Sequence, residues 1–277
     1  MKLTTLPVFC QVGLLGLCLF LQADVDAACS RTILIPVAAT GLTIDVKGEK
    51  VIGIYADALQ EIEKDGCKLN LTNVPRARLE AMFELGTADL LFPSNRTAHR
   101  DKFGVFVPMI KNRPTLISIT TNQINIKSSQ ELLAQKDIRV VLVRGYDYGP
   151  AYQDLLTELA KQGRAFFDTD VISVARMLKN SDKYLTIMAP NTFLGAIHGD
   201  PRVEDLVGKL SFTPINELPW SETGIYLSKK SLNEADRTTL QTVLSRYAKS
   251  GAIFKKFQHY FPTDALKESL RPLDTSP

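Results

Sequence analysis

The sequence predicts an α/β protein of two lobes, each a mostly parallel β-sheet flanked by helices. Short apolar segments of strand length alternate with amphipathic helical segments, which is the pattern of repeated β-α-β units. The alternation stops once, in the polar residues 121–129, and then starts again. With 277 residues, of which 45% are hydrophobic and 23% charged, the chain is long enough for two modest domains of ordinary globular composition.

Residues 1–27 differ from the rest and are predicted to be a cleaved signal peptide. Lys2 precedes an apolar run over residues 8–21, and small residues follow at a spacing that suits a signal peptidase. The run is short for a membrane span, which needs about 20 apolar residues. A retained anchor and a lipidated Cys29 are the alternatives. We therefore expect export to the periplasm, as a monomer, and the mild basic excess does not suggest nucleic-acid binding.

Cleavage would remove two of the four cysteines and leave Cys29 and Cys67 in an oxidising compartment, so we expect one disulfide. The two cysteines immediately precede the predicted strands 32–37 and 68–74. If these strands are parallel neighbours, both sulfurs lie at the same edge of a sheet. A closed loop of roughly 40 residues would stabilise the fold by about 3–4 kcal/mol.

The first lobe is predicted to begin with three strands and two helices in alternation. The helices should end at Gly66 and Gly86, because glycine is the usual residue after a helix C-terminus. The predicted strands are residues 32–37, 68–74 and 89–92, and the predicted helices are residues 55–65 and 77–85.

A second lobe is predicted after the short strand 114–120. Ser128 and Glu131 form a capping-box pattern, residues 139–143 suggest a buried strand, and residues 152–162 a helix. The alternation continues through residues 166–169, 171–179, 184–188, 192–199 and 209–214.

The chain should then return to the first lobe through a second short strand, residues 223–227, followed by two helices within residues 233–261. The first lobe would comprise residues 28–117 and 223–277, and the second residues 118–222, with the two short strands as hinges. Binding sites in open parallel sheets lie beyond the carboxyl ends of the strands, so two facing lobes predict a cleft between them.

Several motifs, in their order and spacing, resemble those of the family 3 extracellular solute-binding proteins, the receptors of polar amino-acid uptake systems. They are Gly53-Ile-Tyr-Ala-Asp57, Gly86-Thr-Ala-Asp89, Arg96-Thr-Ala-His-Arg100 with Phe103 and Pro108 after it, Gly145-Tyr-Asp-Tyr-Gly149 and Gly224-Ile-Tyr-Leu227. The resemblance covers nearly the whole mature chain. It implies a type II periplasmic-binding-protein-like fold, a small ligand in the cleft, an ABC-transporter permease as partner and no cofactor.

The resemblance also implies site residues. In the family, the arginine that matches Arg100 clamps the ligand carboxylate, as suits a two-pronged guanidinium; the alternative is a surface arginine paired with a nearby acid. From the other lobe, the amides of the 145–149 loop precede a helix and would favour an anion. The other predicted ligand contacts are Thr40, Arg78, Ser94, Asn95, Tyr146, Asp147, Tyr148, Asn191 and Glu222.

One position departs from the family. Its amine-binding aspartate usually ends the strand that here closes with Met188, and Asp147 and Glu222 are the candidate substitutes. The departure leaves amino acids, dicarboxylates and other organic acids as possible ligands.

Two other functions remain open. The same fold can serve as a ligand sensor, which genomic proximity to permease genes would distinguish. Some relatives of the family are cyclohexadienyl dehydratases with a carboxylic acid in the cleft. We expect no enzyme and no metal, because His99, His198 and His259 lack metal-ligand spacing and no nucleophile elbow or phosphate loop is present.

Overall fold

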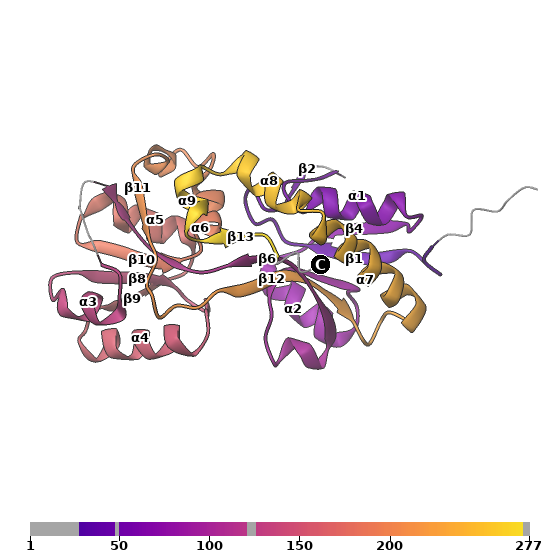
Figure 1. Ribbon diagram of the computed structural model, residues 1–277, viewed down its shortest axis with the longest axis horizontal. Coiled ribbons are helices and arrows are strands. Elements are labelled where there is room, and N and C mark those ends of the chain that lie inside the picture. The colour runs from indigo at the N-terminus through magenta and orange to yellow at the C-terminus, as the bar shows by residue number, and fades with distance from the viewer. Residues whose placement is uncertain (1–27, 48–49, 121–125, 274–277) are drawn as a thin grey trace, which may run out of the picture.

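A computed structural model describes residues 28–47, 50–120 and 126–273 of the chain; the predicted signal peptide lies outside these residues. Two lobes lie side by side along the long axis of the molecule, joined near the middle by extended strands (Figure 1). Sheets and helices alternate in both, which confirms the predicted α/β class with two lobes.

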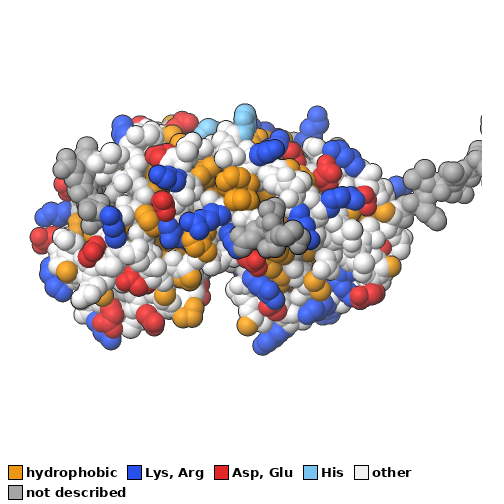
Figure 2. Space-filling model, viewed as in Figure 1, with side chains coloured by type: hydrophobic (Ala, Val, Ile, Leu, Met, Phe, Trp, Pro, Cys, Tyr) orange, Lys and Arg blue, Asp and Glu red, His pale blue; other side chains and the backbone are white. Residues whose placement is uncertain are grey.

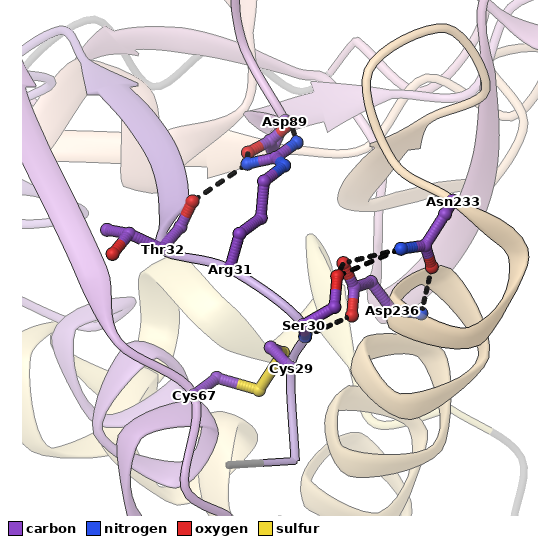
Figure 3. The surroundings of a disulfide bond; sticks show 8 residues. All are labelled: Cys29, Ser30, Arg31, Thr32, Cys67, Asp89, Asn233 and Asp236. Atoms are coloured by element: carbon purple, nitrogen blue, oxygen red, sulfur yellow. Dashed lines mark hydrogen bonds and ion pairs between the residues drawn. A yellow bond between two sulfur atoms is a disulfide. The ribbon is translucent and has the colours of Figure 1, made fainter.

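The first lobe begins with a parallel pair of strands, β1 (Ile33–Val37) and β4 (Leu69–Asn73), with Ile33 opposite Leu69. Cys29 and Cys67 precede these strands and form the predicted disulfide, with their Cα atoms 4.9 Å apart (Figure 3). The hairpin of β2 (Asp45–Lys47) and β3 (Lys50–Ile52) follows β1 and was not predicted, because its strands are too short to show a periodicity.

Two helices of this lobe lie close to their predicted positions. Helix α1 (Ala56–Lys64) buries Leu59 and Ile62 on one face. Helix α2 (Arg76–Leu85) ends at Gly86, whose left-handed conformation is one that glycine adopts without steric cost.

The remaining strands of the first lobe form a four-stranded sheet in the order β13-β6-β12-β5, and every pair in it is antiparallel. The expectation of a mostly parallel sheet is wrong here. Only a short 3₁₀ turn, η1 (Arg100–Lys102), separates β5 from β6, and parallel strands need a longer crossover. The members are β5 (Leu90–Asn95), β6 (Gly104–Asn112), β12 (Ser221–Ser228) and β13 (Leu270–Arg271).

The second lobe contains a five-stranded sheet in the order β11-β7-β10-β8-β9. Its centre and one edge are parallel, as predicted, whereas β7 and β11 run antiparallel to their neighbours. The strands are β7 (Thr115–Ile119), β8 (Arg139–Val143), β9 (Ala165–Asp168), β10 (Tyr184–Met188) and β11 (Leu210–Thr213).

Helices cover both faces of this sheet. Helices α3 (Ser129–Ala134) and α4 (Pro150–Lys161) share an apolar cluster with Val140 and Leu142 of β8. On the other face, α5 (Val171–Asn180) packs against β8, whose Val141 and Val143 belong to the apolar cluster on this side, and α6 (Pro190–Ile197) packs on α5. The alternation of buried side chains along β8 therefore serves two helical layers.

The chain passes between the sheets at residues 113–114 and again at residues 214–220. Strand β7 lies in the five-stranded sheet, whereas the sequence predicts a boundary after residue 117. After β12, helices α7 (Glu234–Lys249) and α8 (Ala252–Tyr260) pack on the first lobe, and α9 (Thr263–Lys267) contacts α6 and β11 of the second (Figure 1). The C-terminal segment thus spans both lobes.

One apolar core runs through both lobes. The same cluster contains Ile33 of β1, Ile110 of β6 and Val143 of β8, together with Phe193 of α6 and Phe261 after α8. Among the described residues, no helix is long and apolar enough to cross a membrane.

Candidate functional site

The surface is hollowed by a notch between the two lobes, on the side where α2 and α4 lie (Figures 1 and 2). Loops leave the carboxyl ends of β1, β5, β8 and β10, and such strand ends are the usual place for a ligand in an α/β fold. Most of the predicted site residues lie on or near these segments, whereas Arg78 lies on α2 and Glu222 on β12.

Opposite elements of the two lobes meet at a pair of glycines. A Cβ atom added at Gly41, which has a φ of +55°, would lie 2.0 Å from the carbonyl oxygen of Gly195 on α6. One added at Gly195 would lie 3.4 Å from the Leu42 nitrogen. The loop after β1 therefore approaches α6 backbone to backbone, and only glycine permits this approach.

Asn191 lies one turn before Gly195 and so on the same side of α6, the side that meets the loop containing Thr40. Its side chain is buried, and its Oδ1 atom has no hydrogen-bond partner among the described residues. The Thr40 hydroxyl donates to the Ala38 carbonyl at 3.0 Å. The fold thus brings these two predicted contacts, one from each lobe, to the same region.

Arg100 follows the carboxyl end of β5, and its guanidinium is engaged. Its Nε atom donates to Oε1 of Glu80 at 2.6 Å and its Nη2 atom to Oε2 at 3.0 Å. Its Nη1 atom donates to the Asn95 carbonyl at 3.0 Å. The acid next in sequence, Asp101, instead accepts from Arg96 and from the Tyr226 hydroxyl. Arg100, which the family resemblance predicts to clamp a ligand carboxylate, therefore binds the carboxylate of Glu80 from the same chain.

The neighbouring strand residues are partly occupied as well. Asn95 accepts a hydrogen bond at Oδ1 from the Thr223 hydroxyl at 2.8 Å. Ser94 is buried, and its hydroxyl has no partner among the described residues. Glu222 is half-buried on β12, opposite Lys111 of β6. Arg78 is exposed near the start of α2.

The loop between β8 and α4 contributes a row of aromatic rings. Tyr148 contacts Tyr146 and Tyr152 edge to face, with ring centroids 6.4 Å and 5.2 Å away. The Ala189 amide, at the start of α6, donates to the Tyr148 hydroxyl at 3.4 Å. Burial raises the pKa of Tyr148, so the phenol stays neutral. Tyr148 therefore links two loops of the same lobe rather than offering a free hydroxyl.

The same loop borders a shallow surface cavity of about 400 Å³. Asp147 is exposed there and accepts the Gly149 amide at Oδ1, which shapes the turn into α4. The cavity is lined by Gly145, Tyr146, Asp147, Gln153, Leu156, Thr157, Ala160 and Phe167.

Met188, at the end of β10, is fully buried. The predicted site residues thus offer an amide oxygen, a hydroxyl and apolar surface, while the predicted carboxylate clamp, Arg100, is already paired. This set suits binding by hydrogen bonds. No cluster of three or more histidine, cysteine, aspartate or glutamate side chains among the described residues is arranged to hold a metal ion.

Three residues that matter at this site were missed from the sequence: Glu80, Gly41 and Gly195. A glycine inside a helix, as at Gly195, lowers helix propensity and so indicates a packing constraint. Nothing in the sequence indicates that Glu80 pairs with a residue 20 positions away.

No protein-family model matches the sequence, and no curated protein matches it significantly. Solved structures do match. The probable amino-acid ABC transporter extracellular-binding protein YtmK from Bacillus subtilis has a TM-score of 0.63 and 15% identity, covering 83% of this chain and 98% of its own. A putative L-cystine ABC transporter protein from Listeria monocytogenes has a TM-score of 0.60 and 15% identity, with coverages of 86% and 98%.

A mutant of ArgBP from T. maritima has a TM-score of 0.59 and 16% identity, with coverages of 83% and 95%. Because nearly the whole length of each neighbour is covered, the match includes both lobes and their connections. The chain therefore has the two-lobed fold of amino-acid ABC-transporter binding proteins, as its sequence motifs predict.

Proposed function

We infer that this chain is an exported binding protein that captures a small solute between its lobes and presents the closed form to an ABC permease. The observation that carries the proposal is the buried, unpartnered Oδ1 atom of Asn191, on the side of α6 that meets the first lobe. Leaving such an acceptor unsatisfied costs about 1–3 kcal/mol. A ligand N–H or O–H group between the lobes would remove this cost.

The fold neighbours support the same role. Among solved structures of similar fold are an ancestral arginine-binding protein bound to arginine and EhuB in complex with hydroxyectoine, and both ligands are small molecules. Lobes connected by crossing segments can close by hinge motion, and ligand contacts from both lobes favour the closed state.

The sequence also favours a carboxylate on the ligand, through Arg100. In the structure Glu80 holds that guanidinium, so a carboxylate ligand would require Glu80 to be displaced. The alternatives of a ligand sensor and of a dehydratase stay predictions. Proximity of the gene to permease genes tests the first, and turnover of prephenate tests the second.

The test is a thermal-shift screen of refolded, ligand-free residues 28–277 against amino acids, uncharged polar solutes and organic acids. A ligand at 100 times its Kd stabilises the folded state by about 2.7 kcal/mol. The affinity for the ligand found in the screen should fall at least tenfold in Asn191→Ala. It should stay unchanged in the control Asn180→Ala, which alters an exposed asparagine of α5. The proposal would be contradicted if no compound of the panel raised the melting temperature, or if Asn191→Ala bound the ligand with unchanged affinity.

A further inference from the structure

We propose that Glu80 is a specificity residue that occupies Arg100 and so makes the interlobe site select uncharged polar ligands over carboxylates. The inference rests on the proposed binding function and names the class of solute that the site accepts.

The pair has the geometry that a bound carboxylate would have. Both oxygens of Glu80 accept from Arg100, at 2.6 Å and 3.0 Å, in the two-pronged arrangement that guanidinium favours. The third donor that is engaged points to the Asn95 carbonyl at 3.0 Å. Glu80 thus takes the donor edge that a ligand carboxylate would use.

Both partners are held by the scaffold. Leu79, next to Glu80, and Phe83, one turn further along α2, are buried in the first lobe. The backbone amide of Arg100 donates to the Thr97 hydroxyl at 3.2 Å. The two side chains are 21% and 31% exposed, so the pair is partly shielded from water. Such a pair is prearranged and needs no ligand to form.

An incoming carboxylate gains little here. To reach Arg100 it would have to replace Glu80, which exchanges one carboxylate–guanidinium pair for another. The displaced Glu80 carboxylate would then lie close to the ligand carboxylate, and like charges at such a distance repel. An uncharged ligand incurs no such repulsion.

The second lobe agrees with this selection. Met188 is fully buried where a carboxylate would be needed to pair with an amine. Asn191 leaves an amide oxygen without a partner, and in the first lobe Ser94 leaves a hydroxyl without one, among the described residues. These are uncharged hydrogen-bonding groups, and they match a ligand with amide or hydroxyl groups.

The test compares succinate with succinamide, which have the same carbon skeleton, by calorimetric titration of three proteins. These are the natural chain, Glu80→Gln, and the control Glu84→Gln, which removes the same charge one turn along α2, where Glu84 contacts His99. We expect Glu80→Gln to bind succinate at least tenfold more tightly than the other two proteins do. Adding Arg100→Ala to Glu80→Gln should abolish that gain. Glu80→Ala, which should behave like Glu80→Gln, is the second variant if glutamine disturbs the fold.

Equal succinate affinity in all three proteins would overturn the inference. So would a carboxylate ligand of the natural chain whose binding Arg100→Ala abolishes, although the proposed binding function would then stand. Conversely, if the natural chain binds no solute in the screen but Glu80→Gln gains succinate, Glu80 blocks Arg100 as inferred and the binding function itself fails.

Discussion

Two arginine–carboxylate pairs of similar geometry lie at opposite ends of β5. At the start of β5, Asp89 accepts hydrogen bonds from both terminal nitrogens of Arg31 at 2.7 Å (Figure 3). At its other end, where Arg100 contacts the Asn95 carbonyl, Glu80 accepts hydrogen bonds from two nitrogens of Arg100. Their surroundings differ: the Asp89 side chain is fully buried and also accepts from the Leu34 amide and the Ser231 hydroxyl. Glu80 is 31% exposed and accepts only from Arg100 among the described residues.

The Arg31–Asp89 pair belongs to a densely connected segment. Cys29 is bonded to Cys67, and the next residue, Ser30, donates through its amide and hydroxyl to Asp236 of α7, both at 2.7 Å (Figure 3). Arg31 follows with its bonds to Asp89. Three successive residues thus tie the start of the described chain to three separate parts of the lobe. The comparison teaches that a fully buried carboxylate with three hydrogen-bond partners stabilises the fold, whereas a partly exposed carboxylate with one partner is available for selectivity.

The largest expected effect follows from Asp89→Ala. It would leave the Arg31 guanidinium, the Ser231 hydroxyl and the Leu34 amide without their acceptor, at a cost of about 3–5 kcal/mol in the free energy of unfolding. Urea unfolding of the purified protein measures this. Asp154→Ala, on the exposed face of α4, should stay within about 0.5 kcal/mol of the natural chain. A loss below about 1 kcal/mol in Asp89→Ala would remove the distinction between the two pairs.

Removing the disulfide should have a comparable or slightly smaller effect. The bond closes a loop between positions 38 residues apart, and the double variant Cys29→Ser, Cys67→Ser should lose about 3–4 kcal/mol. Denaturant titrations with and without reductant check this. Reductant should lower the denaturation midpoint of the natural chain to that of the variant and leave the variant unchanged. If reductant does not change the midpoint of the natural chain, the disulfide does not contribute this stability.

Gly41→Ala tests the contact between the lobes. The added methyl group would collide with the Gly195 carbonyl and would also strain a backbone of positive φ. We expect a loss of about 1–3 kcal/mol and a larger radius of gyration in solution scattering. Gly163→Ala is the matched control, because its φ is +66° but nothing lies near its Cβ position. Identical losses in the two variants would show that the glycine contact contributes nothing.

A smaller effect concerns acid. Burial opposes ionisation of Asp89, but the hydrogen bonds from Arg31, Ser231 and Leu34 outweigh it and lower the pKa below its ordinary value of 3.8. The Asp89 carboxyl therefore binds a proton more weakly in the folded state than in the unfolded state. The resulting stabilisation is present above the ordinary pKa and is lost as the pH falls through the lowered pKa of the folded state. Unfolding free energies of the natural chain should therefore fall more steeply below about pH 4 than those of Asp89→Asn. Parallel curves would contradict this.

The smallest effect on stability is expected for Glu80→Gln. Its pair is partly exposed, and such pairs contribute about 0–1 kcal/mol. The same urea titrations provide the value. If Glu80→Gln lowered the free energy of unfolding as much as Asp89→Ala does, Glu80 would be needed for the stability of the fold, and the difference between the two pairs would disappear.

Most of the fold was predictable because it depends on local patterns. The strands β1, β4, β8 and β10 and the helices from α1 to α8 lie near the predicted ranges, since apolar periodicity and helix-ending glycines report on a few neighbouring residues. The long strand β6 was missed because Pro108, Lys111 and Asn112 interrupt its apolar pattern. Gly224 of β12 lies opposite Pro108 of β6. Glycine is needed there, because an added Cβ atom would lie 2.1 Å from the Val107 carbonyl oxygen.

The candidate site shows where sequence reasoning ends. Motif order was enough to single out Arg100 as the predicted carboxylate clamp, whereas Thr40 and Asn191 lie outside the family-like motifs. It gave no indication of the Glu80–Arg100 pair, because that contact depends on how α2 lies against β5 rather than on either segment alone.

The sequence by itself therefore determined the class of fold, the order of elements and the disulfide, all of which follow from local patterns and residue types. Only the tertiary structure decided the antiparallel sheet of the first lobe, the glycine contact between the lobes and the partner of Arg100. These depend on distances between residues far apart in the chain, and such distances are set by the packing of the whole core rather than by local preference.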